Sequence, residues 1–201
     1  CIDSKYSIDL LAIIIAARLN KNTICIFNPN QTNYEKSNIL KQSNYSMLLS
    51  EKIKKNKKKI NNFYYEIRKN KKVLNKDDAF IVFTSGTTAK PKGAILTDSS
   101  VKNNVLGIIK QLNILPSDRT IIYTPPNYAM GISQMITFLY LRNSFLLDNE
   151  GIRFADTFLK KIKKYKITVL NLNIASFKYL KVFKRSYKLP NLKMVMCGGM
   201  K

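Results

Sequence analysis

The sequence predicts an α/β fold in which layered, largely parallel β-sheets are flanked by helices. Short runs of buried-type residues alternate along the chain with amphipathic stretches of helical length. Pro, Gly and Asn separate the two kinds of segment. Apolar residues make up 45% of the 201 residues, which is a normal share for a folded core, and a chain of this length fits one ordinary domain.

The predicted elements follow one another from the N-terminus. Ser7 is expected to cap a helix that runs to Asn20, because a Ser before an apolar pattern of helical period is a typical helix start. Further helices are predicted at residues 33–42, 99–112, 132–141, 154–164 and 175–184. Strands are predicted where apolar and β-branched residues cluster, at 23–27, 45–49, 79–83, 120–123, 144–147, 167–170 and 192–197.

Residues 51–76 interrupt this alternation with a lysine-rich stretch. Two basic runs, 54–59 and 69–72, lie on either side of the aromatic residues Phe63, Tyr64 and Tyr65. We expect a basic surface loop or a surface helix here. The alternative is a basic-aromatic patch that binds RNA or an anionic lipid surface.

The net charge of +23 at first indicates a nucleic-acid partner. However, 29 Lys, 21 Asn and 24 Ile dominate the sequence, whereas Arg occurs only 6 times. Lys, Asn and Ile share A/T-rich codons, so a codon bias explains the charge without a partner. A dedicated nucleic-acid binder is expected to use more Arg for bidentate contacts. We therefore expect no specific nucleic-acid partner.

Several classes of protein are excluded by what the chain lacks. It has no His, which excludes Ser-His-Asp and Cys-His catalysis within these residues. Its three Cys are widely spaced and form neither a disulfide framework nor a zinc pattern, so a reduced, cytoplasmic setting is expected. The longest apolar run, Leu10 to Ala17, is far too short for a transmembrane segment.

Residues 83–94 carry the chemistry that the sequence shows most clearly. Hydroxyl groups, flexible glycines and lysines follow a buried strand, and such a loop forms a cradle for phosphate groups. It is not a Walker P-loop, because Ala94 follows the second Gly where that motif requires Lys and then Ser or Thr. The hydroxyls belong to Thr84, Ser85, Thr87 and Thr88, the glycines are Gly86 and Gly93, and the lysines are Lys90 and Lys92.

This stretch resembles the phosphate-binding signature of the adenylate-forming superfamily, which includes acyl-CoA synthetases, amino-acid adenylation domains and luciferases. Two departures are Ala89, where the family usually has Gly, and Asp98, where many members carry His. The resemblance extends to residues 7–29, 125–131, 167–169 and 189–199. It implies that residues 1–201 are part of the large N-terminal, AMP-binding domain of such an enzyme.

The resemblance also implies roles for individual residues. Thr84, Ser85, Thr87 and Thr88 would bind the β- and γ-phosphates of ATP. Lys92 and Lys90 would balance the charge of the departing pyrophosphate, with Gly86 and Gly93 as the flexible points of the loop. Adenine would lie against Gly198 and Gly199. Tyr128, with Met130 and Gly131, would border the acyl pocket, and the alternative for Tyr128 is ordinary packing before a helix.

The family's later motifs do not appear before Lys201. These are the Glu that helps to hold Mg²⁺ and the Lys of a small C-terminal catalytic subdomain. We therefore expect no catalytic or metal-binding residue within residues 1–201, and expect this piece by itself to be inactive.

The complete enzyme would use ATP and Mg²⁺ to activate a carboxylic acid. It would then pass the acyl group to CoA or to the phosphopantetheine of an acyl carrier protein. Fatty, aromatic and amino acids are all compatible with the sequence. A second hypothesis is a non-catalytic or decayed nucleotide-binding fragment, and a third is a basic nucleic-acid binder that uses residues 51–76.

Overall fold

The computed structural model describes residues 1–27, 31–52, 58–60, 62–69, 74–84, 92–182 and 187–198. It has the α/β fold that the sequence predicts, with parallel strands and flanking helices. Contacts divide the chain into two compact units. Unit 1 contains residues 1–104 and 125–132, and unit 2 contains residues 105–124 and 133–201.

The sheet of unit 1 is parallel in its centre and antiparallel at both margins. The order of its described strands is β4-β5-β3-β1-β2-β6-β7, and β3, β1, β2 and β6 are parallel to one another. The antiparallel pairs are β3–β5, β4–β5 and β6–β7. The strands are β1 (Ile2–Asp3), β2 (Ile24–Phe27), β3 (Met47–Ser50), β4 (Lys58–Ile60), β5 (Phe63–Ile67), β6 (Asp78–Thr84) and β7 (Lys92–Thr97).

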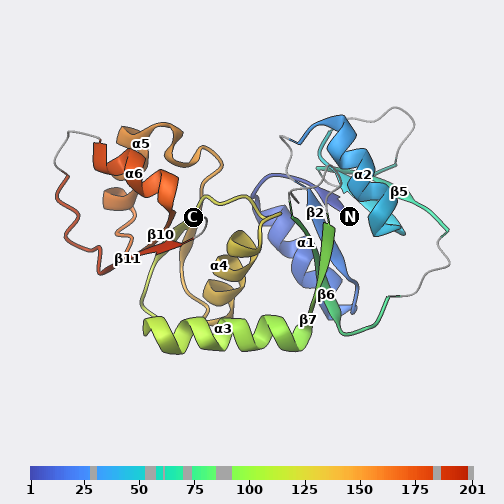
Figure 1. The fold of residues 1–201 in the computed structure, drawn as a ribbon, viewed down its shortest axis with the longest axis horizontal. Helices are drawn as coiled ribbons and strands as arrows, with labels where there is room; N and C mark the ends of the chain where they lie inside the picture. Colours follow the sequence, from blue (N-terminus) through green and yellow to red (C-terminus); the bar gives the residue numbers. More distant parts are fainter. Residues whose placement is uncertain are drawn as a thin grey trace. The chain divides into compact units, whose positions relative to one another are not determined.

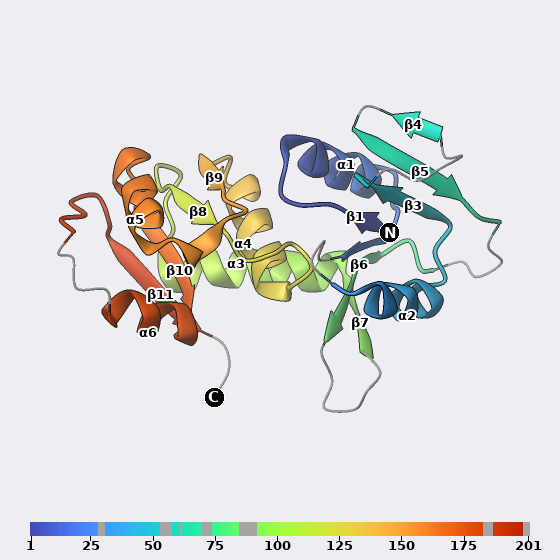
Figure 2. The same ribbon diagram turned by 90° about the horizontal axis from the view of Figure 1, so that it is seen from above.

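Two helices of unit 1 lie on opposite faces of its strands (Figure 2). They are α1 (Ile8–Leu19), between β1 and β2, and α2 (Asn33–Ser43), between β2 and β3. Since β2 and β3 flank β1 on different sides, the two right-handed crossovers run in opposite directions and place their helices on different faces. Ser7 caps α1 as predicted, because its hydroxyl accepts a hydrogen bond of 3.0 Å from the Leu10 amide.

Strands form in unit 1 at three places where the sequence analysis predicted none. Part of the lysine-rich stretch, predicted as loop or surface helix, is instead the β4–β5 hairpin at the sheet margin, with Lys59 Nζ 5.8 Å from the centre of the Tyr64 ring. β1 is short, and β7 pairs with β6 along its whole length. Marginal strands are easy to miss, because their exposed residues lack the apolar run that marks a buried strand.

The sheet of unit 2 is entirely parallel in its described strands. Its order is β11-β10-β8-β9, which Figure 1 shows in part. Within the described residues, no helix is long and apolar enough to cross a membrane. The strands are β8 (Thr120–Ile122), β9 (Phe145–Leu147), β10 (Val169–Asn173) and β11 (Met194–Gly198). The helices are α3 (Asp98–Leu112) and α4 (Ala129–Tyr140), which contribute to both units, and η1 (Gly151–Arg153), α5 (Ala155–Lys164) and α6 (Ile174–Val182) in unit 2.

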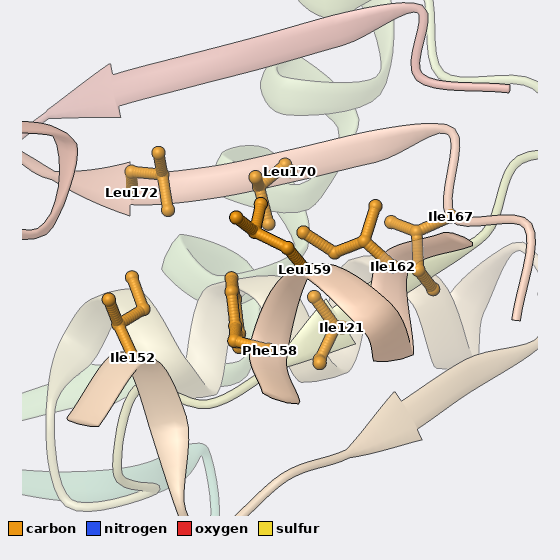
Figure 3. Packing of buried hydrophobic residues seen from close by; sticks show 8 residues of the cluster. All are labelled: Ile121, Ile152, Phe158, Leu159, Ile162, Ile167, Leu170 and Leu172. Carbon is orange, nitrogen blue, oxygen red and sulfur yellow. The ribbon is translucent and has the colours of Figure 1, made fainter. Parts of the chain in front are cut away.

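The core of unit 2 forms where α5 packs on the sheet (Figure 3). Phe158 and Ile162 of α5 are each 1% exposed and face Ile121 of β8 and Leu170 of β10. The ring of Tyr123 meets the Phe158 ring edge-on, with 5.3 Å between ring centres. This packing fixes the position of the residues that follow β8 and β10.

Candidate nucleotide-binding site

The two ends of the predicted phosphate loop are held together by strand pairing. Thr84 is the last residue of β6 and pairs with Lys92, the first residue of β7. β6 runs parallel to β2, so its C-terminal end lies at the carboxyl edge of the sheet, where ligand loops of α/β proteins gather. The Lys92 side chain is exposed there. The other predicted phosphate ligands, Ser85, Gly86, Thr87, Thr88 and Lys90, lie outside the described residues.

Gly93 lies close to a neighbouring side chain across the hairpin. A Cβ at this position would lie 3.0 Å from Cε1 and 3.1 Å from Cζ of Phe83, its cross-strand partner. Its φ angle is not in the left-handed region; among the described glycines only Gly151 has a positive φ. Gly93 lies within the regular strand β7, and its role as a flexible point of the loop stays a prediction.

Polar side chains pair with one another at the carboxyl ends of β1 and β3, and Asp3, Lys36 and Ser4 among them are shielded from solvent. Lys36 of α2 donates to both carboxylate oxygens of Asp3, at 2.9 and 3.1 Å, and each side chain is 11% exposed. The Ser4 hydroxyl donates to the Glu51 carboxylate, which ties the ends of β1 and β3 together. Since a buried charge is costly unless it is paired, the Lys36–Asp3 contact satisfies the two charges that are shielded at this edge of the sheet.

Residues 125–131 form a turn that leads into α4. The Tyr128 amide donates to the Pro125 oxygen at 3.1 Å, and the Tyr128 oxygen accepts from the Ile132 amide at 3.1 Å. Tyr128 is 49% exposed, so the alternative that its ring is buried in the core is wrong. Met130 is partly buried and Gly131 is buried within α4.

Asn127 is a candidate ligand-binding residue that the sequence analysis missed. It is 9% exposed, and its Oδ1 has no hydrogen-bond partner among the described residues. A buried acceptor without a donor is unfavourable, and a bound ligand or water would supply one. The only sequence signal was its place directly before Tyr128, in the segment already considered for the acyl pocket.

The carboxyl edge of the unit 2 sheet exposes backbone at Gly198. Gly198 ends β11 and pairs with Asn173, the last residue of β10. A Cβ on Gly198 would meet no atom within 4 Å, so there is open space beside the backbone. The side-chain oxygen of Asn173 already has a hydrogen-bond partner, since Oδ1 accepts from the Ser176 amide at 2.7 Å. Gly199 lies outside the described residues.

Tyr123 lies at the same edge of unit 2, directly after β8. Burial raises the pKa of its phenol, so the hydroxyl stays protonated near neutral pH. No group of three or more His, Cys, Asp or Glu side chains within the described ranges is arranged to hold a metal ion.

Comparison with known families adds an independent line of evidence. The family model described as AMP-binding enzyme matches residues 4–201. A nonribosomal peptide synthetase of Emericella nidulans, ivoA, is 26% identical over 121 residues, which are 60% of this chain and 7% of that protein. A probable CoA ligase of Humulus lupulus, CCL8, is 33% identical over 76 residues, or 37% of this chain and 12% of that protein.

Solved structures share the fold. The o-succinylbenzoate CoA synthetase of Bacillus subtilis, in complex with its acyl-adenylate intermediate, superimposes with a TM-score of 0.81 at 17% identity. That similarity covers all of this chain and 55% of the synthetase. A fatty acyl-adenylate ligase of L. pneumophila, bound to acyl adenylate and pyrophosphate, gives a TM-score of 0.78 at 16% identity, over 99% of this chain and 40% of that one. The chain thus spans about half the length of the synthetase and a small part of the peptide synthetase.

Proposed function

This chain belongs to the family of AMP-binding enzymes, and we propose that its protein activates a carboxylic acid with ATP. The products of this step are an acyl-adenylate and pyrophosphate. The activated acyl group then passes to a thiol, which is either CoA or the phosphopantetheine of a carrier protein.

The observation that most supports this proposal is the position of the sequence motif on the hairpin. The hydroxyl- and lysine-rich residues 84–93 connect two paired strands at a carboxyl edge. Neighbouring strands lie about 4.8 Å apart, so Thr84 and Lys92 hold both ends of the loop close together. The sequence between these ends supplies backbone amides, hydroxyls and ammonium groups, which are the groups that bind a triphosphate.

The proposed reaction needs positioning and charge stabilisation rather than a protein nucleophile. A carboxylate oxygen of the acid attacks the α-phosphorus, and the bond from that phosphorus to the pyrophosphate oxygen breaks. Lys92, with Lys90, would stabilise the charge that develops on pyrophosphate, while Thr84, Ser85, Thr87 and Thr88 would hold its oxygens. This division of roles agrees with a chain that has no His.

Gly198 and Gly199 would bind adenine, and the open space beside Gly198 fits a planar ring lying against backbone. Tyr128, Met130 and Gly131 would border the acid. Asn127 adds an unpaired acceptor to that segment. Its amide oxygen could accept from a hydroxyl or an amine on the substrate.

The proposal is tested by acid-dependent exchange of labelled pyrophosphate into ATP, with a panel of fatty, aromatic and amino acids. Lys92→Ala should lower the exchange rate at saturating ATP by about 10- to 100-fold, since one charge-stabilising donor is worth about 1.5–3 kcal/mol. Lys110→Ala is the matched control, because Lys110 is an exposed lysine on α3. It removes the same charge without touching the loop.

Two results would refute parts of the proposal. MgATP binding with no acid-dependent exchange across the panel would mean that the protein binds nucleotide without activating an acid. Full exchange in Lys92→Ala, with loss in Lys110→Ala, would show that the lysine of the loop has been assigned wrongly.

A further inference from the structure

A charged cluster closes the end of the β6–β7 hairpin that lies opposite the loop. Arg18, near the C-terminus of α1, donates from Nη2 to both carboxylate oxygens of Asp98, each at 2.7 Å. Its Nη1 donates to the backbone oxygens of Asn22 at 2.6 Å and Asp78 at 3.0 Å. Asp78 begins β6 and Asp98 directly follows β7. One guanidinium therefore joins both strands of the hairpin to α1.

The cluster is well shielded from solvent on the arginine side. The Arg18 side chain is 15% exposed and that of Asp98 40%. Burial by itself raises the pKa of Asp98, but the hydrogen bonds and charges of Arg18 and Lys21 outweigh burial and lower the pKa below its usual value. Lys21 Nζ lies 3.2 Å from the carboxylate. A planar guanidinium can bind a carboxylate and two carbonyls at once, which an ammonium cannot do in this geometry.

The cluster lies beside an irregularity in the strand pairing. The register of β6 and β7 shifts between Asp78 and Phe80. Beyond this point the pairing is regular up to Thr84 and Lys92. A slip of one residue would turn every side chain of a strand to the other face of the sheet. Asp78 pairs with Thr97 before this shift, and the pairing beyond the shift places Lys92 opposite Thr84.

We propose that Arg18 is a positioning residue for the phosphate loop. By holding Asp78 and Asp98 it fixes the register of the β6–β7 hairpin, and with it the placement of Lys92 opposite Thr84, where the two ends of the loop begin. It acts through the hairpin and not by contact, because the seven residues of β6 separate it from the loop by about 20 Å. This inference rests on the proposed function of the loop and adds a residue that is remote in the sequence.

The test compares Arg18→Gln and Arg18→Lys with a matched control, Lys193→Gln. Lys193 donates to Asp118 in unit 2 at 2.7 Å, and Asp118 keeps other partners when Lys193 is removed, as Asp98 keeps Lys21. The KM for ATP, the KM for the acid and kcat are measured by pyrophosphate exchange. Hydrogen exchange of the β7 amides is followed in the same proteins.

Arg18→Gln should raise the KM for ATP about five-fold, a typical size for coupling through a rigid element, and leave the KM for the acid within two-fold. Faster hydrogen exchange should be confined to β6 and β7. Arg18→Lys should behave like Arg18→Gln, because one ammonium cannot replace the forked contacts. Lys193→Gln should change neither the KM for ATP nor the rate of hydrogen exchange at the β7 amides.

Three results would overturn the proposal: an unchanged KM for ATP in Arg18→Gln, recovery in Arg18→Lys, or faster hydrogen exchange spread evenly over unit 1. The last result would mean that Arg18 only stabilises the fold. If the wild-type protein shows no acid-dependent exchange of pyrophosphate into ATP, the proposed function fails. The hydrogen-exchange comparison needs no turnover and still tests whether Arg18 holds the hairpin.

Discussion

Replacing Gly93 with Ala tests directly how the loop is supported. The new Cβ would lie 3.0 and 3.1 Å from two atoms of the Phe83 ring and 3.3 Å from Cγ2 of Ile81. Carbon atoms prefer about 3.5–4.0 Å, so the ring must move by a few tenths of an ångström. Overpacking of this kind costs about 1–3 kcal/mol, and the reduced entropy of the unfolded chain returns about 0.5–1 kcal/mol. We expect a net loss of about 1–2 kcal/mol in the free energy of unfolding.

The assay is urea unfolding followed by far-UV circular dichroism, because the chain contains no Trp for fluorescence. Phe83→Leu removes the two ring atoms that the new methyl group meets. The double variant should therefore lose less stability than the sum of the single variants, with a coupling of about 1 kcal/mol. Additive losses, or a Gly93→Ala variant as stable as the wild type, would refute the packing explanation.

Gly93→Ala and the double variant with Phe83→Leu also distinguish two roles of Gly93, which are packing against the Phe83 ring and allowing a ligand to approach the backbone. If Gly93 serves only the Phe83 ring, the losses of MgATP affinity in the double variant are smaller than the sum of the single losses, as the losses of stability are. If a phosphate also approaches the Gly93 backbone, the stability losses are still coupled but the affinity losses are additive. Isothermal titration with MgATP distinguishes the two outcomes.

Three further substitutions test the packing and charges of the fold. Asp118→Ala should lower the unfolding free energy by about 3 kcal/mol, since the nearly buried carboxylate accepts from the Leu115 amide, Thr168 and Lys193; a loss under 1 kcal/mol would contradict this. Lys166→Gly should raise the unfolding free energy by about 0.5–1 kcal/mol, because residue 166 follows α5 with a φ of 52°, in the left-handed region that glycine adopts without strain. An unchanged unfolding free energy would argue against strain at this residue. The pKa of Asp98 is lowered on folding, so its stabilisation is present above about pH 4 and is lost as the pH falls through the folded pKa. Urea unfolding between pH 3 and 7 should show Asp98→Asn less stable than wild type at pH 7, with the difference shrinking as the pH falls below about 4, and a pH-independent difference would refute the assignment.

The sequence predicted the helices and the buried strands because these elements have local signals. The Ser7 cap, the amphipathic pattern of α5 and the apolar runs of β2 and β8 lie within a few neighbouring residues. The place of residues 84–93 after a buried strand was also predicted, and the structure puts Thr84 at the end of β6. Such features depend on periodicity and capping, which a single sequence contains.

What the sequence missed depends on contacts between distant residues. Arg18 and Asp98 are 80 positions apart, and no pattern near either residue indicates that they pair. The role of Gly93 depends on which residue lies across from it, and thus on the register of a strand that was not predicted. The β4–β5 hairpin forms although its lysines favour solvent, because pairing with β3 and the burial of Phe63 outweigh local preference.

An isotope experiment determines whether a carboxylate oxygen of the acid attacks the α-phosphorus of ATP. An acid that supports pyrophosphate exchange is labelled with ¹⁸O in its carboxylate and incubated with the protein, MgATP and a thiol acceptor. One labelled oxygen should appear in AMP, because the bond between that oxygen and the acyl carbon breaks when the thiol attacks. Formation of ADP with label in inorganic phosphate, or of unlabelled AMP, would contradict this prediction.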